Sequence, residues 1–148
     1  QWERALRIDL TAVFLCIKHQ VPAMLQSGGG AIVNTASGLG QIAIPKAAEY
    51  VSAKHGVVGL TRAAAVELGG RNIRVNSVLP GIVETDLISR LAEQAEFKAF
   101  LGRSKDRHLM GRFPTPCEIG EVVAWLLSDH ASFVNGAAVP VDGGYLVN

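Results

Sequence analysis

The sequence predicts an α/β fold in which a parallel sheet of about three strands is flanked by helices. Two observations support this prediction: short β-rich runs alternate with helical segments, and the strands are bounded by glycine or proline turns. Such alternation is typical of parallel sheets with helices on both faces. With 148 residues, 49% of them hydrophobic, the chain is long and apolar enough to form one compact core.

The first half of the chain predicts a helix, a strand and a second helix. Apolar residues recur at helical spacing from Trp2 to about Leu25, and Pro22 is expected to bend that helix or to end its regular part. A glycine turn over residues 27–30 leads into a strand over residues 31–35. After a polar loop, the second helix covers residues 47–68 and stops at two glycines.

The second half predicts a strand, two helices and a last strand. The strand over residues 73–79 is ended by Pro80 and Gly81, and one helix is expected from Glu84 to about Leu101. Residues 115–118 form a capping box with proline at the first helical position, which starts a helix reaching residue 128. The last strand covers residues 137–141.

Composition and charge exclude several classes of function. The formal charge is +1 with basic residues spread along the chain, which gives no footprint for nucleic acid or an anionic membrane. No apolar run long enough to span a bilayer, and no signal peptide, is evident. Cys16 and Cys117 lie far apart outside any CxxC, and the four histidines are scattered, so we expect reduced thiols, no metal site and a cytoplasmic protein.

The segment Tyr50-Val-Ser-Ala-Lys54 is the first candidate for chemistry. Residues four apart share one face of a helix, so the Lys54 ammonium is expected to lie near the Tyr50 phenol. A free phenol has a pKa near 10, and a nearby cation lowers that pKa, which makes the phenol a usable general acid or base. The bland alternative is a half-buried tyrosine beside a solvated lysine, since this spacing often arises by chance.

Two strand ends add to this candidate site. Ser37 follows the first strand, and Pro80 and Gly81 follow the second strand, so all three belong to the carboxyl edge of a parallel sheet, where open α/β sheets bind ligands. Taken singly, Ser37 is a turn or cap serine, and Pro80-Gly81 is a strand-ending turn. Together with Tyr50 and Lys54, they outline one site.

Four motifs in order resemble the classical short-chain dehydrogenase/reductase family over essentially the whole chain. They are IVNTASGLG with Ser37, YVSAK with the HGVVGLTRAAAVEL that follows it, RVNSVLPGIVETDL, and PVDGGY near the end. The resemblance implies that residues 1–148 are the C-terminal part of a single Rossmann-like domain. It also implies NAD or NADP as cofactor and hydride transfer between a secondary alcohol and a ketone, with a small-molecule alcohol or ketone as substrate.

The resemblance also implies a role for each matching residue. Tyr50 would be the acid/base, Ser37 would orient the substrate oxygen, and Lys54 would tune Tyr50 and hold the nicotinamide ribose. Ile82 would contact the carboxamide through its backbone, and Thr85 would support the carboxamide and pyrophosphate. The implied cofactor-binding set is Tyr50, Lys54, Pro80, Gly81, Ile82 and Thr85.

Asp9 departs from the family pattern, in which many relatives have asparagine on the first helix. The family residue helps to hold a water that links the active-site lysine to solvent, partly through its backbone, which Asp9 can still supply. An aspartate there can also pair with Lys54 and weaken its effect on Tyr50, or it can be only a polar helix residue. All three interpretations stay open at this stage.

The chain also lacks the glycine-rich turn and the NNAG segment that begin the family's domain. The sequence is therefore expected to start in a middle helix of the domain, without the residue that selects NAD or NADP. The three strands would then leave an edge open, and this chain alone would bind cofactor weakly and tend to associate. The substrate lid would lie between residues 88 and 110, where Leu91, Phe97, Phe100, Leu101 and Leu109 are either pocket wall or lid packing.

Small residues on the first two long helices permit close packing, and the resemblance implies a homodimer or homotetramer through these helices. They are Ala12, Ala48, Ser52, Ala53, Gly56, Gly59, Ala63 and Ala64. Two other interpretations are a non-catalytic fragment of the same fold and an epimerase or dehydratase of the extended branch of the family. The short ending PVDGGYLVN argues against the extended branch, whose members carry a larger substrate domain.

Overall fold

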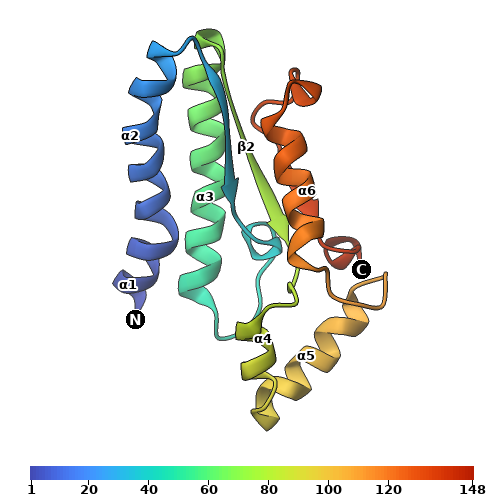
Figure 1. Cartoon of the computed structure of the whole chain (residues 1–148). Coiled ribbons are helices and arrows are strands. Elements are labelled where there is room, and N and C mark those ends of the chain that lie inside the picture. The colour runs from blue at the N-terminus through green and yellow to red at the C-terminus, as the bar shows by residue number, and fades with distance from the viewer.

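A computed structural model describes all residues 1–148 and contains one parallel sheet of three strands in the order β1-β2-β3 (Figure 1). The strands are β1 (Gly30–Thr35), β2 (Ile73–Pro80) and β3 (Ala138–Val141). Gly30 lies opposite Ile73 at the start of the first pair, and Ser77 lies opposite Ala138 at the start of the second. The central strand β2 is buried along nearly its whole length. The α/β fold expected from the sequence is confirmed.

Helices cover both faces of the sheet (Figure 1). One face is covered by α3 (Ala48–Leu68), with α2 (Ala12–Gln26) beside it, and the other by α6 (Pro116–Leu127). On the first face, the core is formed by Ile17, Ile32, Ala64, Ala65, Leu68, Ile73 and Val75. On the second, Leu126 of α6 is fully buried against Val78 and Ala131. Burial on both faces requires partners for the polar residues of β2, and Arg74 donates to the Ser128 carbonyl at 3.0 Å while Asn76 donates to the Val134 carbonyl at 2.8 Å.

The first helical segment is continuous from Trp2 to Gln26 and includes one π-helical turn. It consists of α1 (Trp2–Leu6), η1 (Arg7–Thr11) and α2, and η1 is the π turn. Pro22 lies inside α2, which runs on to Gln26, so the expectation that Pro22 ends the regular helix is wrong. The ring of Pro22 removes one donor but leaves the last turn intact.

The segment between β2 and α6 differs from the single helix expected over residues 84–101. It forms α4 (Asp86–Leu91) and α5 (Ala95–Arg107), separated by a short break in which Gln94 is extended. We call α4 and α5 the lid helices. The start of α4 is capped by Thr85, whose hydroxyl accepts a hydrogen bond from the Ile88 amide at 3.4 Å. The capping box that begins α6 is present, with the Thr115 amide donating to Glu118 at 2.8 Å.

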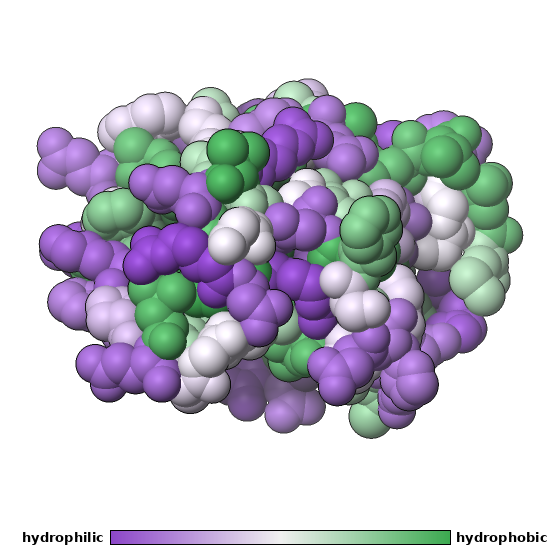
Figure 2. Space-filling view, turned by 90° about the horizontal axis from the view of Figure 1, so that it is seen from above, coloured by the Kyte–Doolittle hydropathy of each residue, from purple (hydrophilic) through white to green (hydrophobic).

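Much of the surface of α1, η1 and α2 is apolar and exposed. Ile8, Phe14 and Leu15 are each between 43% and 54% exposed, and Ile17 is the only buried residue of the 25. By length and composition this segment is apolar enough to cross a membrane, although the sequence analysis found no such run. In the structure it packs along α3 as a layer of the fold. At the end of the molecule away from the lid helices, hydrophobic side chains are scattered among hydrophilic ones (Figure 2).

The loop after β1 is held against α3 by a glycine. This loop contains a short 3-10 turn, η2 (Gly38–Gly40). A Cβ added to Gly40 would lie 2.9 Å from the Lys54 carbonyl oxygen and 3.1 Å from a methyl group of Val58. The absence of a side chain therefore lets the loop that carries Ser37 approach the helix that carries Lys54.

We expect Gly40→Ala to lower the free energy of unfolding by about 1–3 kcal/mol, because the new methyl group would push the loop from the helix backbone. The matched control is Gly59→Ala, since Gly59 is an exposed residue of α3 with nothing within 4 Å of an added Cβ. This control should raise the free energy of unfolding by up to about 1 kcal/mol. Urea unfolding of both variants measures the difference, and equal stabilities would refute the packing argument.

Candidate active site

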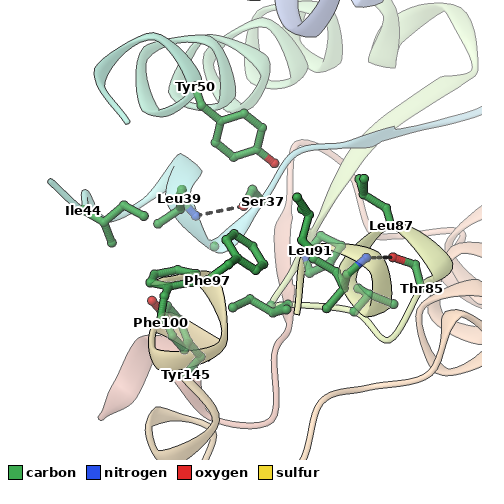
Figure 3. A pocket seen from close by; sticks show the side chains of 16 residues that line it. Ser37, Leu39, Ile44, Tyr50, Thr85, Leu87, Leu91, Phe97, Phe100 and Tyr145 are labelled. Carbon is green, nitrogen blue, oxygen red and sulfur yellow. Dashed lines mark hydrogen bonds between the residues drawn. The ribbon is translucent and has the colours of Figure 1, made fainter. Parts of the chain in front are cut away.

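A cavity of about 610 Å³ opens where β1 and β2 end, between the first turn of α3 and the lid helices (Figure 3). Both strands are parallel, so their carboxyl ends meet at this edge of the sheet. The lining residues are mostly apolar and none is charged. They are Ser37, Gly38, Leu39, Ile44, Tyr50, Pro80, Gly81, Ile82, Val83, Thr85, Leu87, Ile88, Leu91, Phe97, Phe100 and Tyr145.

Tyr50 and Ser37 face each other across this cavity. Tyr50 lies in the first turn of α3, is 36% exposed, and points its hydroxyl toward Ser37 (Figure 3). Ser37 directly precedes η2, and its hydroxyl oxygen accepts a hydrogen bond from the Leu39 amide at 3.2 Å. That bond fixes the Ser37 side chain just after the carboxyl end of β1. A substrate oxygen placed between the two hydroxyls would be within reach of both.

Lys54 lies one helical turn after Tyr50 and is buried behind it. Its Nζ is 5.5 Å from the centre of the Tyr50 ring, donates to the Thr35 carbonyl at 3.3 Å, and lies 3.6 Å from Oδ1 of Asp9. Lys54 is only 9% exposed, and a buried ammonium needs such partners to offset its lost hydration. Neither Lys54 nor Asp9 lines the cavity. Lys54 lies next to the Tyr50 ring, and Asp9 lies next to Lys54.

Burial in the apolar cavity raises the pKa of Tyr50 above its ordinary value. Hydrogen bonding with Ser37 lowers this pKa, and the negative charge of Asp9 raises it, with burial the largest effect. The sequence predicts that the nearby Lys54 ammonium lowers the pKa of Tyr50. The expectation was wrong about the net direction, because it could not include the apolar surroundings, and because the carboxylate of Asp9 faces the same ammonium.

The residues at the end of β2 are the ones that could hold the nicotinamide end of a dinucleotide. Pro80, Gly81, Ile82 and Thr85 all line the cavity. The Gly81 amide donates to the Val141 carbonyl at 3.3 Å, whereas the amide of Ile82 has no partner and is free to donate to a carboxamide. An added Cβ on Gly81 would lie 2.5 Å from Nε2 of buried His108, so only glycine fits here.

The lid helices and the last residues of the chain form the apolar wall. Phe97 and Phe100 pack with ring centres 5.6 Å apart, and Leu91 lies beside them in the cavity. Of the other expected wall residues, Leu101 is buried outside the cavity lining and Leu109 is exposed. Leu101 therefore packs inside the lid and Leu109 lies on the surface, so neither residue forms the pocket wall.

Tyr145 is a cavity residue that the sequence analysis missed. It follows β3, is 7% exposed, and packs against His108 with ring centres 5.0 Å apart. The guanidinium of Arg107 lies 4.3 Å above its ring and donates to its hydroxyl at 3.3 Å. The turn Asp142-Gly-Gly144 before Tyr145 was the available signal, because it directs the chain back toward the end of β2.

Comparison with known proteins places these features in context. A model of the family described as enoyl-(acyl carrier protein) reductase matches residues 1–146. Cyclohexanol dehydrogenase from Acinetobacter sp. (strain SE19) is 49% identical over 144 residues, which cover 97% of this chain and 54% of that protein. A 2,5-dichloro-2,5-cyclohexadiene-1,4-diol dehydrogenase from Sphingobium indicum is 44% identical over 147 residues, covering 98% of this chain and 58% of that protein.

A solved structure of a named dehydrogenase also matches nearly the whole of this chain. The structure of carveol dehydrogenase from Mycobacterium avium in complex with NAD superimposes with a TM-score of 0.92 at 37% identity, covering 99% of this chain and 57% of that one. This chain thus spans between half and two thirds of the length of these relatives.

We expect Ser37→Ala to raise the pKa of Tyr50 further, because the variant removes the hydroxyl that lowers that pKa. Carbon-13 tyrosine NMR measures this pKa without any turnover, with the Tyr50 signal assigned by its loss in Tyr50→Phe. The matched control is Ser52→Ala, since Ser52 is an exposed serine of α3. An unchanged or lower Tyr50 pKa in the Ser37 variant would contradict the assignment of Ser37 to this site.

Proposed function

Because the chain belongs to the classical short-chain dehydrogenase/reductase family, we propose that the complete protein is an oxidoreductase that interconverts a secondary alcohol and a ketone with NAD or NADP. The observation that carries this proposal is the uncharged cavity in which the Tyr50 and Ser37 hydroxyls face each other, with buried Lys54 behind them. The dehydrogenase names of the relatives support the reaction class.

The nicotinamide ring, when bound, supplies the hydride acceptor or donor. In the oxidising direction, the phenolate of Tyr50 accepts the hydroxyl proton as the C–H bond of the carbinol breaks and its electron pair leaves as hydride. In the reducing direction, the phenol of Tyr50 returns a proton to the carbonyl oxygen. The Ser37 hydroxyl donates to the same oxygen and stabilises the charge that develops there. Lys54 favours the phenolate and, as in the family that the chain resembles, would hold ribose hydroxyls of the bound cofactor.

The cavity wall supports an apolar substrate. No charged side chain lines the cavity, and its wall includes Phe97, Phe100 and Leu91. A charged or heavily hydroxylated group would lose its hydration there without gaining partners. We therefore propose that the part of the substrate around the carbinol carbon is apolar and uncharged, such as an alicyclic ring. The names of the two dehydrogenases that act on six-membered rings agree with this class.

A substrate panel tests the proposal on the complete protein. We expect kcat/KM for cyclohexanol to exceed that for a cyclic polyol of similar size by at least about tenfold, because the polyol leaves hydroxyl groups unpaired in the apolar cavity. Tyr50→Phe should reduce turnover of the better substrate by at least about a hundredfold, because the variant has no group to exchange the proton.

The control for this test is Tyr145→Phe, which removes the other phenolic hydroxyl of the cavity but leaves the proposed proton path intact. Substantial turnover by Tyr50→Phe would refute the mechanism and favour another proton path, whereas no turnover of any substrate by the unmodified complete protein would favour a non-catalytic protein. A preference for the polyol would refute only the substrate class.

We also propose that the complete protein is a homodimer or homotetramer in which the exposed side of α1, η1 and α2 packs against a second copy. Ile8, Phe14 and Leu15 of this segment are exposed in this chain, which covers 54% of a relative's length, and they support the proposal because large apolar side chains in water favour a contact. We propose a cytoplasmic location as well, which the sequence predicts from two isolated cysteines outside any CxxC.

Light scattering of the complete protein tests the oligomer. We expect an even number of subunits for the unmodified protein and a smaller assembly for Phe14→Glu, because the new carboxylate would be buried in the contact. Phe133→Glu is the control, since Phe133 is fully exposed and lies beyond α6. A monomeric unmodified protein would overturn this proposal.

A further inference from the structure

We propose that Asp9 is a positioning residue that sets the pH range of the enzyme, because its carboxylate holds Lys54 and offsets the ammonium charge available to Tyr50. Alcohol oxidation would then require a higher pH than it would with an uncharged side chain at position 9. This inference rests on the proposed function, in which Tyr50 exchanges the proton and Lys54 favours its ionised form.

Packing brings Asp9 to Lys54. Asp9 lies in the π turn η1, and its neighbour Leu10 packs on Gly56 of α3, where an added Cβ would lie 2.7 Å from a Leu10 methyl group. The small residue at 56 therefore lets η1 approach α3 closely. At this contact Oδ1 of Asp9 is 3.6 Å from Nζ of Lys54, and the Asp9 side chain is 30% exposed. Its carboxylate thus retains some solvent contact while it faces an ammonium that is almost fully buried.

Few other charges act on Tyr50. The loop after β1, the end of β2, the lid helices and the last residues contribute only uncharged side chains to the cavity. Glu49 precedes Tyr50 in α3, but its carboxylate is exposed and accepts a hydrogen bond from the Gln1 side chain at 2.9 Å. Within residues 1–148, the charged groups nearest the phenol are therefore Lys54 from its own helix and Asp9 from η1.

The two charges act in opposite directions. The ammonium of Lys54 favours the phenolate, and the carboxylate of Asp9 disfavours it and shields the ammonium. In agreement with this geometry, Asp9 raises the pKa of Tyr50. A phenol that ionises only at higher pH is a weaker base for oxidation at neutral pH. The same phenol remains a proton donor for ketone reduction up to a higher pH.

The variant Asp9→Asn tests the inference, because asparagine keeps the shape of the side chain and removes the charge. At a pH below the Tyr50 pKa, kcat/KM for alcohol oxidation should rise by about threefold to tenfold, because more of the enzyme holds a phenolate. The alkaline limit of ketone reduction should move to lower pH in the same variant. Glu3→Gln is the matched control, since it removes one carboxylate from an exposed site of the same helical segment.

A direct measurement separates this inference from the proposed function. Carbon-13 tyrosine NMR of the complete protein reports the Tyr50 pKa even if no substrate is turned over. We expect this pKa to fall in Asp9→Asn, to stay near the original value in Asp9→Glu, and to be unchanged in Glu3→Gln. Circular dichroism checks folding, and Asp9→Ser takes the place of any Asp9→Asn protein that does not fold.

A Tyr50 pKa that stays the same or rises without the Asp9 charge would overturn the inference, whatever the activity of the protein. Failure of the proposed function would instead appear as turnover that survives Tyr50→Phe. The two failures are therefore distinguished by different measurements.

Discussion

The buried ammonium of Lys54 joins the elements on which the site depends. It donates to the Thr35 carbonyl at the end of β1, pairs with Asp9 in η1, and lies one turn behind Tyr50 on α3. A charge this deeply buried must keep its partners, because losing either one leaves an ammonium without hydration. The same contacts that stabilise Lys54 therefore fix the distance between the strand end, the first helical segment and the phenol. The close approach of the loop at Gly40 and of η1 at Gly56 makes this arrangement possible.

Substrate recognition and proton transfer place opposite demands on Tyr50. An apolar wall with Phe97 and Phe100 suits an apolar alcohol, but the same wall removes water from the phenol and raises its pKa. Ser37 and Lys54 work against that rise, and Asp9 works with it. In this account, the acidity of the phenol is the balance of four neighbours and not a property of the lysine spacing alone. The balance favours the protonated phenol, which is the form that donates to a ketone.

Much of the fold could be predicted from the sequence, because its signals are local. Periodicity and turn chemistry predict the strand ends, the long helix α3 and the capping box at Thr115. The position of Ser37, Pro80 and Gly81 after parallel strands, and of Tyr50 at the start of α3, was enough to predict that these residues meet at one edge of the sheet. The break between α4 and α5 was missed because residues 92–94 contain no glycine or proline, so the break depends on tertiary contacts. Tyr145 was missed because its place in the wall depends on the chain folding back after β3. The direction of the Tyr50 pKa shift depends on burial of the phenol in the folded chain, which no local motif records.

The most direct measurement is a crystal structure of the complete protein with oxidised cofactor and cyclohexanone in the cavity, a pair that cannot exchange hydride. We expect the ketone oxygen to lie within hydrogen-bond distance of both the Tyr50 hydroxyl and the Ser37 hydroxyl, with the ring against Phe97 and Phe100. A ketone oxygen bound by other groups, with the two hydroxyls facing away from it, would contradict the account.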